Sequence, residues 1–281
     1  MTTIVDILSS HRTRRPIVMG VLNVTPDSFS DGGAFLPPAA ARARAEQMLA
    51  DGADVIDVGA ESTRPGSRRV PAEEQISRLE EILPAVCAAA RQRGALVSID
   101  TTRAAVARFA LQAGASILND VSAGRDDPDL LPLAAERKIP VVLMHMFGEP
   151  ATMQTNPQYT DVVADVKAFL AGRIAAAVAT GLPREYCIVD PGIGFGKRLE
   201  HNLALLGGVG ELCTLGVPVL LGASRKRFIG ELTGASDPAD RLGGTIGACL
   251  LGYAAGASVF RVHDVAPVKQ ALNIATAVNT R

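Results

Sequence analysis

Eight short apolar segments rich in Val, Ile and Leu recur along the whole chain, and helix-forming stretches separate them. The apolar segments lie at 17–22, 54–58, 96–99, 116–118, 140–144, 187–189, 217–221 and 258–262. The stretches between and after them are rich in Ala, Leu and Arg and lie at 38–51, 72–93, 103–113, 128–137, 160–180, 200–215, 238–255 and 266–278. Continuous apolar strands that alternate with helices indicate a parallel sheet with both faces covered.

A glycine precedes most of the predicted strands. Six of the seven helix-to-strand junctions carry one, and only the junction before 140–144 has Lys138-Ile139-Pro140 instead. Glycine just past a helix end adopts the left-handed conformation without a Cβ penalty, so these positions mark helix ends. Eight such units favour an α/β fold of the (β/α)8 TIM barrel type, with an open doubly wound sheet as the alternative.

No linker-like or low-complexity segment divides the 281 residues. We therefore predict a single domain over 1–281, with 1–16 as an N-terminal extension. The extension does not resemble a signal peptide, because its basic residues follow the apolar ones. No apolar run approaches the ~18 residues that a membrane helix needs. These features predict a cytoplasmic protein.

The charges of the chain nearly cancel. Lys and Arg number 28 against 29 Asp and Glu, which gives a net charge of −1. A field over the whole chain that attracts nucleic acid or an anionic membrane is therefore excluded as the basis of function. Small-molecule partners are expected instead.

Polar residues follow the predicted strands, at the end of a barrel where active sites lie. One set has the donors and acceptors that suit a flat heterocycle with several hydrogen-bonding edges: Asp100, Asn119, Asp190 and Lys226. A second set suits an anion such as a phosphate: Asn23, Thr63, Arg64, Arg261 and His263. The two sets together predict a phosphorylated heterocyclic substrate.

The strings that carry these residues resemble the motifs of the dihydropteroate synthase family, in the order in which that family has them. They are MGVL and NVTPDSFSDGG at 19–33, DVGAESTRPG at 57–66, SIDT at 98–101, ND at 119–120, LMHM at 143–146, DPGIGFGK at 190–197, GASRKRFIG at 222–230 and RVHDV at 261–265. The resemblance implies a pterin-binding (β/α)8 barrel that is usually a homodimer.

The resemblance also implies a reaction. The family joins p-aminobenzoate to 6-hydroxymethyl-7,8-dihydropterin diphosphate, forms 7,8-dihydropteroate and pyrophosphate in folate biosynthesis, and is the target of sulfonamides. Mg²⁺ assists, and pyrophosphate is expected to leave before the arylamine attacks, in an SN1-like step. Such an enzyme is a transferase.

Residue roles carried over from the family divide the site by substrate. The resemblance assigns the pterin ring to Asp100, Asn119, Asp190, Lys226 and Arg261. It assigns the diphosphate to Asn23, Thr63, Arg64, Arg261 and His263, with Asn23 as the Mg²⁺ ligand. It assigns p-aminobenzoate to Phe29, Pro65, Phe195 and Arg227. The catalytic residues are then Asp100, Lys226, Arg261 and His263.

Several residues have simpler interpretations. Asp57 lies inside a predicted strand and His145 follows another, so both are interpreted as structural. Asp27 and Asp31 are ordinary loop residues or further Mg²⁺ ligands. Two other functions remain open: a methyltransferase that uses methyltetrahydrofolate and a corrinoid protein, and a silent relative that binds pterin without turnover. The STRPG and RVH strings argue against both.

Overall fold

Eight parallel strands form a barrel in the computed structural model, which describes residues 1–25, 37–62, 66–148 and 152–279. Their hydrogen-bonded order is β6-β5-β4-β3-β2-β1-β8-β7. A single parallel bridge between Val189 and Val219 joins the two ends of this order, and the Val189 N–H donates to the Pro218 carbonyl at 2.9 Å. The prediction of a (β/α)8 barrel rather than an open sheet is confirmed.

Every predicted apolar segment contains or overlaps a strand. The strands are β1 (Ile17–Asn23), β2 (Val55–Gly59), β3 (Leu96–Asp100), β4 (Ile117–Asp120), β5 (Val141–Met144), β6 (Cys187–Asp190), β7 (Leu220–Leu221) and β8 (Val259–Val262). Only β7 is much shorter than its predicted segment, 217–221. Pro218 contributes to that difference, because proline has no N–H to donate to a neighbouring strand.

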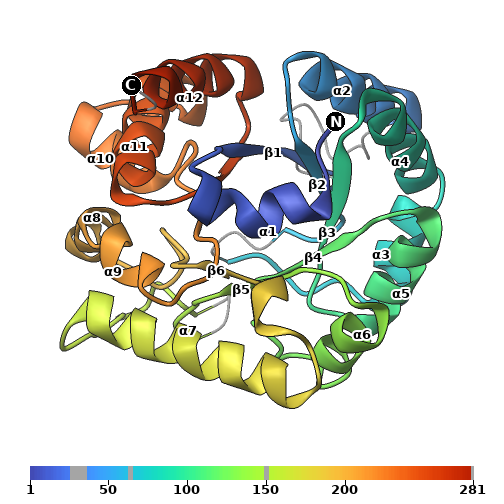
Figure 1. Ribbon diagram of the computed structural model, residues 1–281, viewed down its shortest axis with the longest axis horizontal. Helices are drawn as coiled ribbons and strands as arrows, with labels where there is room; N and C mark the ends of the chain where they lie inside the picture. Colours follow the sequence, from blue (N-terminus) through green and yellow to red (C-terminus); the bar gives the residue numbers. More distant parts are fainter. Residues whose placement is uncertain (26–36, 63–65, 149–151, 280–281) are drawn as a thin grey trace.

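Helices cover the outside of the barrel (Figure 1). The described helices are α1 (Ile4–Thr13), α2 (Pro38–Ala50), α3 (Ala72–Leu79), α4 (Ile82–Arg93), α5 (Ala104–Ala113), α6 (Leu130–Arg137), α7 (Val162–Ala179), α8 (Leu199–Gly207), α9 (Val209–Cys213), α10 (Arg227–Thr233), α11 (Leu242–Ala255) and α12 (Val265–Asn279), with short 3-10 turns η2 (Arg184–Tyr186) and η3 (Pro238–Arg241).

Three predicted helices are divided, and beyond the N-terminal extension one helix was not predicted. The stretch 72–93 forms α3 and α4, and Pro84 then falls in the first turn of α4, where its missing N–H costs no hydrogen bond. The stretch 200–215 divides at Gly208 into α8 and α9. The stretch 238–255 begins as η3 at Pro238 and continues as α11. The unpredicted helix is α10, which ends at Gly234 with φ 75°.

The predicted N-terminal extension contains α1, which lies across one end of the barrel (Figure 1). The Thr3 side chain accepts a hydrogen bond from the Asp6 N–H, and the Asp6 carboxylate accepts one from the Thr3 N–H, so the helix begins with a capping box. Ile7 is fully buried and packs on apolar side chains inside the barrel: Ile17, Met19, Val55, Ile117, Val142, Ile188, Leu220 and Val259. The extension therefore closes the N-terminal end of the strands.

The predicted glycine junctions are confirmed. The six glycines before strands have φ between 68° and 114°: Gly52, Gly94, Gly114, Gly181, Gly216 and Gly256. At the seventh junction Lys138 takes the same left-handed conformation, with φ 50°, although it carries a Cβ atom.

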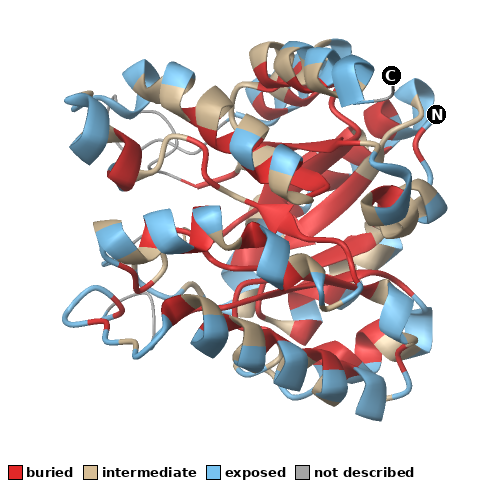
Figure 2. Cartoon of the chain, turned by 60° about the vertical axis from the view of Figure 1, so that its left-hand side comes forward, coloured by how far each residue is buried: buried red, intermediate tan, exposed pale blue. Residues whose placement is uncertain are grey.

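The strands are buried along nearly their whole length, and the outer helices are exposed on their outward faces (Figure 2). The largest apolar cluster fills the layer between strands and helices. No helix in the described part of the chain combines the length and apolar character needed to cross a membrane.

Candidate active site

Side chains inside the barrel change from apolar to polar along the strands. The apolar cluster around Ile7 fills the N-terminal half. Toward the C-terminal ends, Gly59, Asp100 and Asn119 are direct neighbours across β2, β3 and β4. Because parallel strands end at the same rim, residues that are distant in the sequence meet there.

Arg261 of β8 lies at the centre of the polar half. Its Nε donates to Asp57 Oδ2 at 2.7 Å, and its terminal Nη2 donates to Asp100 Oδ2 at 2.8 Å. Asn119 Nδ2 donates to the same Asp57 oxygen at 3.0 Å. Four strands are thus connected by one hydrogen-bonded network.

A small pocket opens above this network. Its empty space is about 340 Å³, part of it open to solvent, and its lining is Asp100, Asn119, Val121, Met144, Asp190, Ile193, Phe195, Gly222, Lys226 and Arg261. All five residues predicted to bind the pterin ring are among them. The structure therefore brings this predicted set together.

Lys226 and Asp190 lie on the side of the pocket formed by β6 and β7. Lys226 Nζ donates to the Ile193 carbonyl at 2.6 Å and lies 4.1 Å from the centroid of the Phe195 ring. Asp190 Oδ1 accepts a hydrogen bond from the Gly192 N–H at 2.7 Å. Their other polar atoms are therefore available to a ligand with donors and acceptors on its edge.

Burial changes the acidity of the groups that line the pocket. Desolvation raises the pKa of Asp100 to about 7, against the attraction of Arg261 and together with the repulsion of Asp57. Desolvation likewise raises the pKa of Asp190. It lowers the pKa of Lys226 to about 8, although the nearby Asp190 opposes the shift. Perturbed groups of both signs in one pocket are typical of a functional site.

The described members of the predicted anion set, Asn23, Arg261 and His263, lie in or beside this pocket. A Cβ atom at Gly59 would lie 3.7 Å from Asn23 Oδ1 and 3.4 Å from the Asp100 Cβ, so Gly59 separates the two halves of the site. His263 follows β8, with Nδ1 3.1 Å from Ser224 Oγ. Thr63 and Arg64 lie outside the described residues.

The loops after β7 and β8 are joined by a bidentate ion pair. Arg225 donates from Nε and Nη2 to the two carboxylate oxygens of Asp264, at 2.9 and 2.5 Å. Such bidentate pairs fix direction as well as distance. The pair holds Ser224 and Lys226, which flank Arg225, against the strand end that carries His263.

The p-aminobenzoate set is only partly described. Phe195 lines the pocket, whereas Phe29 and Pro65 lie outside the described residues. Arg227 begins α10 with its side chain 89% exposed, and its Nε contacts Glu231 Oε1 at 2.7 Å. Arg227 is therefore not among the described residues that line the pocket.

Asn23 is compatible with Mg²⁺. Its amide oxygen is a hard ligand, and Mg²⁺ commonly takes one or two protein oxygens together with substrate phosphates and waters. Among the described residues no three His, Cys, Asp or Glu side chains gather into a further metal site. Asp27 and Asp31 lie outside the described part of the chain.

Lys197 lies in this region and has no role in the sequence-based prediction. It is 3% exposed, and its Nζ lies 3.0 Å from His145 Nδ1 and 3.0 Å from the Phe195 carbonyl oxygen. Desolvation lowers the pKa of Lys197 to about 7 and that of His145 to about 3. The signal was present, since a lysine directly after the glycine-rich DPGIGFG string lies beside a predicted strand end.

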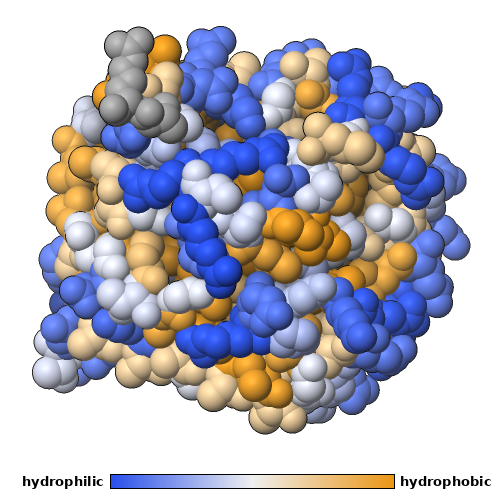
Figure 3. All heavy atoms as spheres, viewed as in Figure 1, coloured by the Kyte–Doolittle hydropathy of each residue, from blue (hydrophilic) through white to orange (hydrophobic). Residues whose placement is uncertain are grey.

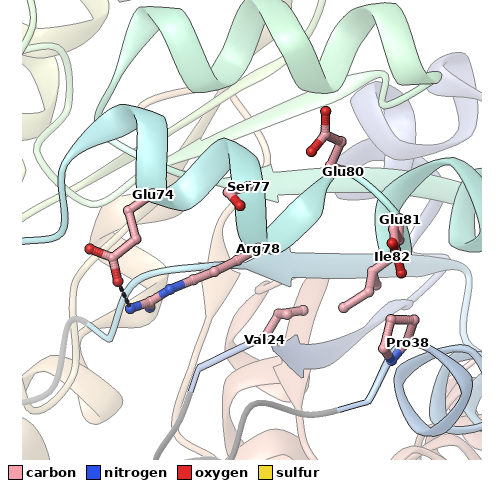
Figure 4. Close-up of a pocket in the computed structure, with 8 residues that line it drawn as sticks. All are labelled: Val24, Pro38, Glu74, Ser77, Arg78, Glu80, Glu81 and Ile82. Carbon is pink, nitrogen blue, oxygen red and sulfur yellow. Dashed lines mark hydrogen bonds and ion pairs between the residues drawn. The ribbon is translucent and has the colours of Figure 1, made fainter.

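A second hollow lies outside the barrel, between α3 and the segment around Val24 and Pro38 (Figure 4). Arg78 borders it but is already engaged, since it donates to Glu74 at 2.5 Å and to the Ala60 carbonyl at 2.7 Å. None of the predicted site residues is among the residues that line it: Val24, Pro38, Glu74, Ser77, Arg78, Glu80, Glu81 and Ile82. The pocket inside the barrel is therefore the candidate active site.

Comparison with known proteins agrees with this geometry. Residues 19–263 match the model of a family described as pterin binding enzyme. The dihydropteroate synthase of Synechocystis sp. is 44% identical over 94% of this chain and 91% of its own length, and that of Neisseria meningitidis serogroup B is 44% identical over 92% of each. The chain belongs to the dihydropteroate synthase family. It is accordingly a transferase.

Solved structures of the dihydropteroate synthase family have the same fold. One from Xanthomonas albilineans with 4-aminobenzoic acid has a TM-score of 0.88 and 46% identity, and covers 95% of this chain and 94% of its own. Another from that organism, in complex with 7,8-dihydropteroate, has a TM-score of 0.84 and 43% identity, with 95% coverage of both. One from Yersinia pestis with a sulfonamide drug complex has a TM-score of 0.88 and 40% identity, again with 95% coverage of both.

Proposed function

We propose that this chain condenses 6-hydroxymethyl-7,8-dihydropterin diphosphate with p-aminobenzoate to give 7,8-dihydropteroate and pyrophosphate. The pocket that joins Asp100, Asn119, Asp190 and Lys226 carries the proposal, because a pterin has donors and acceptors on the edges that these groups would meet. Related structures hold 4-aminobenzoate and 7,8-dihydropteroate. Sulfonamides would compete with p-aminobenzoate, in line with the Yersinia pestis complex.

In the proposed mechanism pyrophosphate leaves before the arylamine attacks. The positive charge left on the methylene carbon spreads into the pterin ring, where Asp100 and Asp190 would stabilise it. Arg261 and His263, with Thr63 and Arg64, would bind the departing diphosphate. Mg²⁺ held by Asn23 would supply further charge stabilisation there. Phe195, with Phe29, Pro65 and Arg227 as the family predicts, would hold p-aminobenzoate and exclude water.

Pyrophosphate release tests the reaction. Purified protein is mixed with the pterin diphosphate, with and without p-aminobenzoate and Mg²⁺, and dihydropteroate is measured in parallel. Release that requires both additions, with equal formation of product, is the expected result. Tight binding of pterin without product would instead identify a silent relative.

Asp100→Asn tests the electrostatic role of that carboxylate. The amide keeps the size of the side chain but removes its charge, so turnover should fall on the order of 100-fold while the pterin diphosphate still binds. Binding is measured by calorimetry and turnover by product formation. A variant that turns over at the normal rate would contradict the role assigned to Asp100.

We also propose a cytoplasmic homodimer. Large apolar side chains are exposed on neighbouring helices of the C-terminal part, and Figure 3 shows hydrophobic surface at the left-hand edge, over α10. The exposed side chains are Leu232, Leu251, Ile274 and Val278. Within the glycine-rich stretch 243–248, Gly244 packs against Ile229 of α10, which an added Cβ atom would meet. Gly244 therefore contributes little to a surface for a second subunit. Sedimentation of a monomer at micromolar concentration would contradict the dimer.

A further inference from the structure

Asp57 is a buried carboxylate beneath the candidate active site. Its side chain is 0% exposed, and it is not among the residues that line the pocket. One oxygen, Oδ2, accepts hydrogen bonds from Arg261 and from Asn119, at 2.7 and 3.0 Å. The other oxygen, Oδ1, accepts no hydrogen bond from the described residues.

That arrangement is costly for folding alone. A carboxylate without water needs partners for both oxygens, and a half-satisfied one destabilises the barrel interior. The sheet could have carried an apolar residue here, as Val55 does two positions earlier on the same face of β2. A buried carboxylate in β2 that destabilises the folded state indicates a functional role.

The charges around Asp57 indicate which role. The carboxylates Asp57, Asp100 and Asp190 lie at the polar end of the barrel together with the cations Lys226 and Arg261. Arg261 is bound to Asp57 and Asp100 at once, so Asp57 decides where its guanidinium lies. Asp57 also orients the Asn119 amide, because its Oδ2 accepts a hydrogen bond from Asn119 Nδ2.

We propose that Asp57 is a positioning residue of the pterin site, which fixes Arg261 and Asn119 and supplies a negative charge beneath the ring. The proposal rests on the proposed function, because the ring that this charge favours is the pterin. Asp57 itself does not touch the substrate. Its charge lies near that of Asp100, and both carboxylates are paired with Arg261 away from water.

Asp57→Asn tests the proposal. The amide preserves size but removes the charge that orients Arg261, so calorimetry should show the affinity for 6-hydroxymethyl-7,8-dihydropterin diphosphate falling about 10- to 100-fold. The KM for p-aminobenzoate should stay within about twofold, since the described partners of Asp57 are Asn119 and Arg261, neither of which is assigned to p-aminobenzoate.

The pH profile separates an electrostatic role from a merely structural one. Arg261 and Lys226 face Asp100 with positive charge, and Asp57, Asp120 and Glu61 face it with negative charge. Asp57 raises the pKa of Asp100, so its removal lowers that pKa. The loss of binding and turnover on acidification should therefore move to lower pH in Asp57→Asn.

Ser98→Ala is the matched control. Ser98 is the register partner of Asp57 on β3, is equally buried, and has no hydrogen-bond partner for its hydroxyl among the described residues. The Ser98→Ala variant should leave the affinity for the pterin diphosphate and the pH profile of binding unchanged. The proposal is overturned if Asp57→Asn behaves like Ser98→Ala, or loses affinity without any shift of the acidic limb.

Binding and turnover distinguish the two proposals. Wild-type protein that binds the pterin diphosphate but forms no product refutes the proposed function, and the binding data then still decide the role of Asp57. Wild-type turnover with an unaltered Asp57→Asn variant refutes only the inference. If thermal unfolding shows that Asp57→Asn does not fold, Asp57→Ser, smaller and also neutral, undergoes the same measurements with the same expected and contradicting results.

Discussion

At the scale of single residues, Lys197 connects two loops that border the pocket. Its Nζ contacts His145, which follows β5, and the Phe195 carbonyl in the loop after β6. Phe195 in turn lies against Lys226. A buried lysine with these partners fixes the position of the ring that is proposed to contact p-aminobenzoate.

Lys197→Met tests this connection. Methionine keeps most of the apolar stem but removes the amine, so the loop that carries Phe195 should loosen. We expect the KM for p-aminobenzoate to rise about 3- to 10-fold, with a smaller change for the pterin diphosphate. Steady-state kinetics with each substrate varied in turn measures both.

The control is Lys167→Met. Lys167 lies on the outer helix α7 and forms an ion pair with Glu211 at 3.1 Å, in a partly exposed position. Surface pairs of this kind contribute little, so both KM values should stay within about twofold. An equal rise in both KM values for Lys197→Met would indicate a general loss of structure and contradict the specific role.

The sequence predicts the residues that line the pocket better than the residues that hold them in place. Asp100, Asn119, Asp190 and Lys226 each follow a predicted strand, and topology alone brings strand ends together. The position of Asp57 inside a predicted strand favours a structural role, and both faces of a strand in this barrel are buried. Hydrophobicity therefore does not show which side of β2 faces the interior.

At the scale of elements, local signals placed most boundaries. Positive-φ glycines end helices where predicted, and Pro84 marks the break between α3 and α4 that hydrophobicity alone did not reveal. The helix α10 was missed because its polar start was interpreted as part of the rim. Packing against Gly244 of α11 supports this short helix, and that contact is not visible in the sequence.

Lys138 provides a prediction at this scale. It ends α6 with φ 50° and an exposed side chain, so Lys138→Gly removes the strain of a Cβ atom in the left-handed region. We expect the free energy of unfolding to rise by about 0.5–1 kcal/mol, measured by urea denaturation. Lys138→Ala, which keeps the Cβ atom, should show no such gain; a comparable gain would contradict the explanation.

At the scale of the whole molecule, α1 seals the end of the barrel opposite the site. Thr3 and Asp6 form its capping box, but the packing of Ile7 inside the barrel is not visible in the sequence, because a sequence does not show which surface an amphipathic helix covers. Because α1 lies at the end opposite the site, a substitution in α1 should change the free energy of unfolding without changing turnover.

Ile7→Ala tests that separation. The lost apolar contacts and the cavity should lower the free energy of unfolding by roughly 2–5 kcal/mol, while turnover per folded molecule stays normal. Denaturant unfolding and product formation measure the two quantities. Val5→Ala, at a 73% exposed position of the same helix, should change stability by less than about 0.5 kcal/mol. Reduced turnover in fully folded Ile7→Ala would show that the two ends are coupled.

The ring of strands closes between β6 and β7, which are the two ends of the hydrogen-bonded strand order. One bridge, between Val189 and Val219, closes the ring there, and β7 has only two residues. Asp190 and Lys226 stand on opposite sides of this seam, so a pterin bound to both, as proposed, would act as a cross-link between β6 and β7. Ligand that binds only the closed ring stabilises it by mass action. The substrate would then also hold the barrel closed, and amides along the seam should exchange with solvent most slowly when the pterin diphosphate is bound.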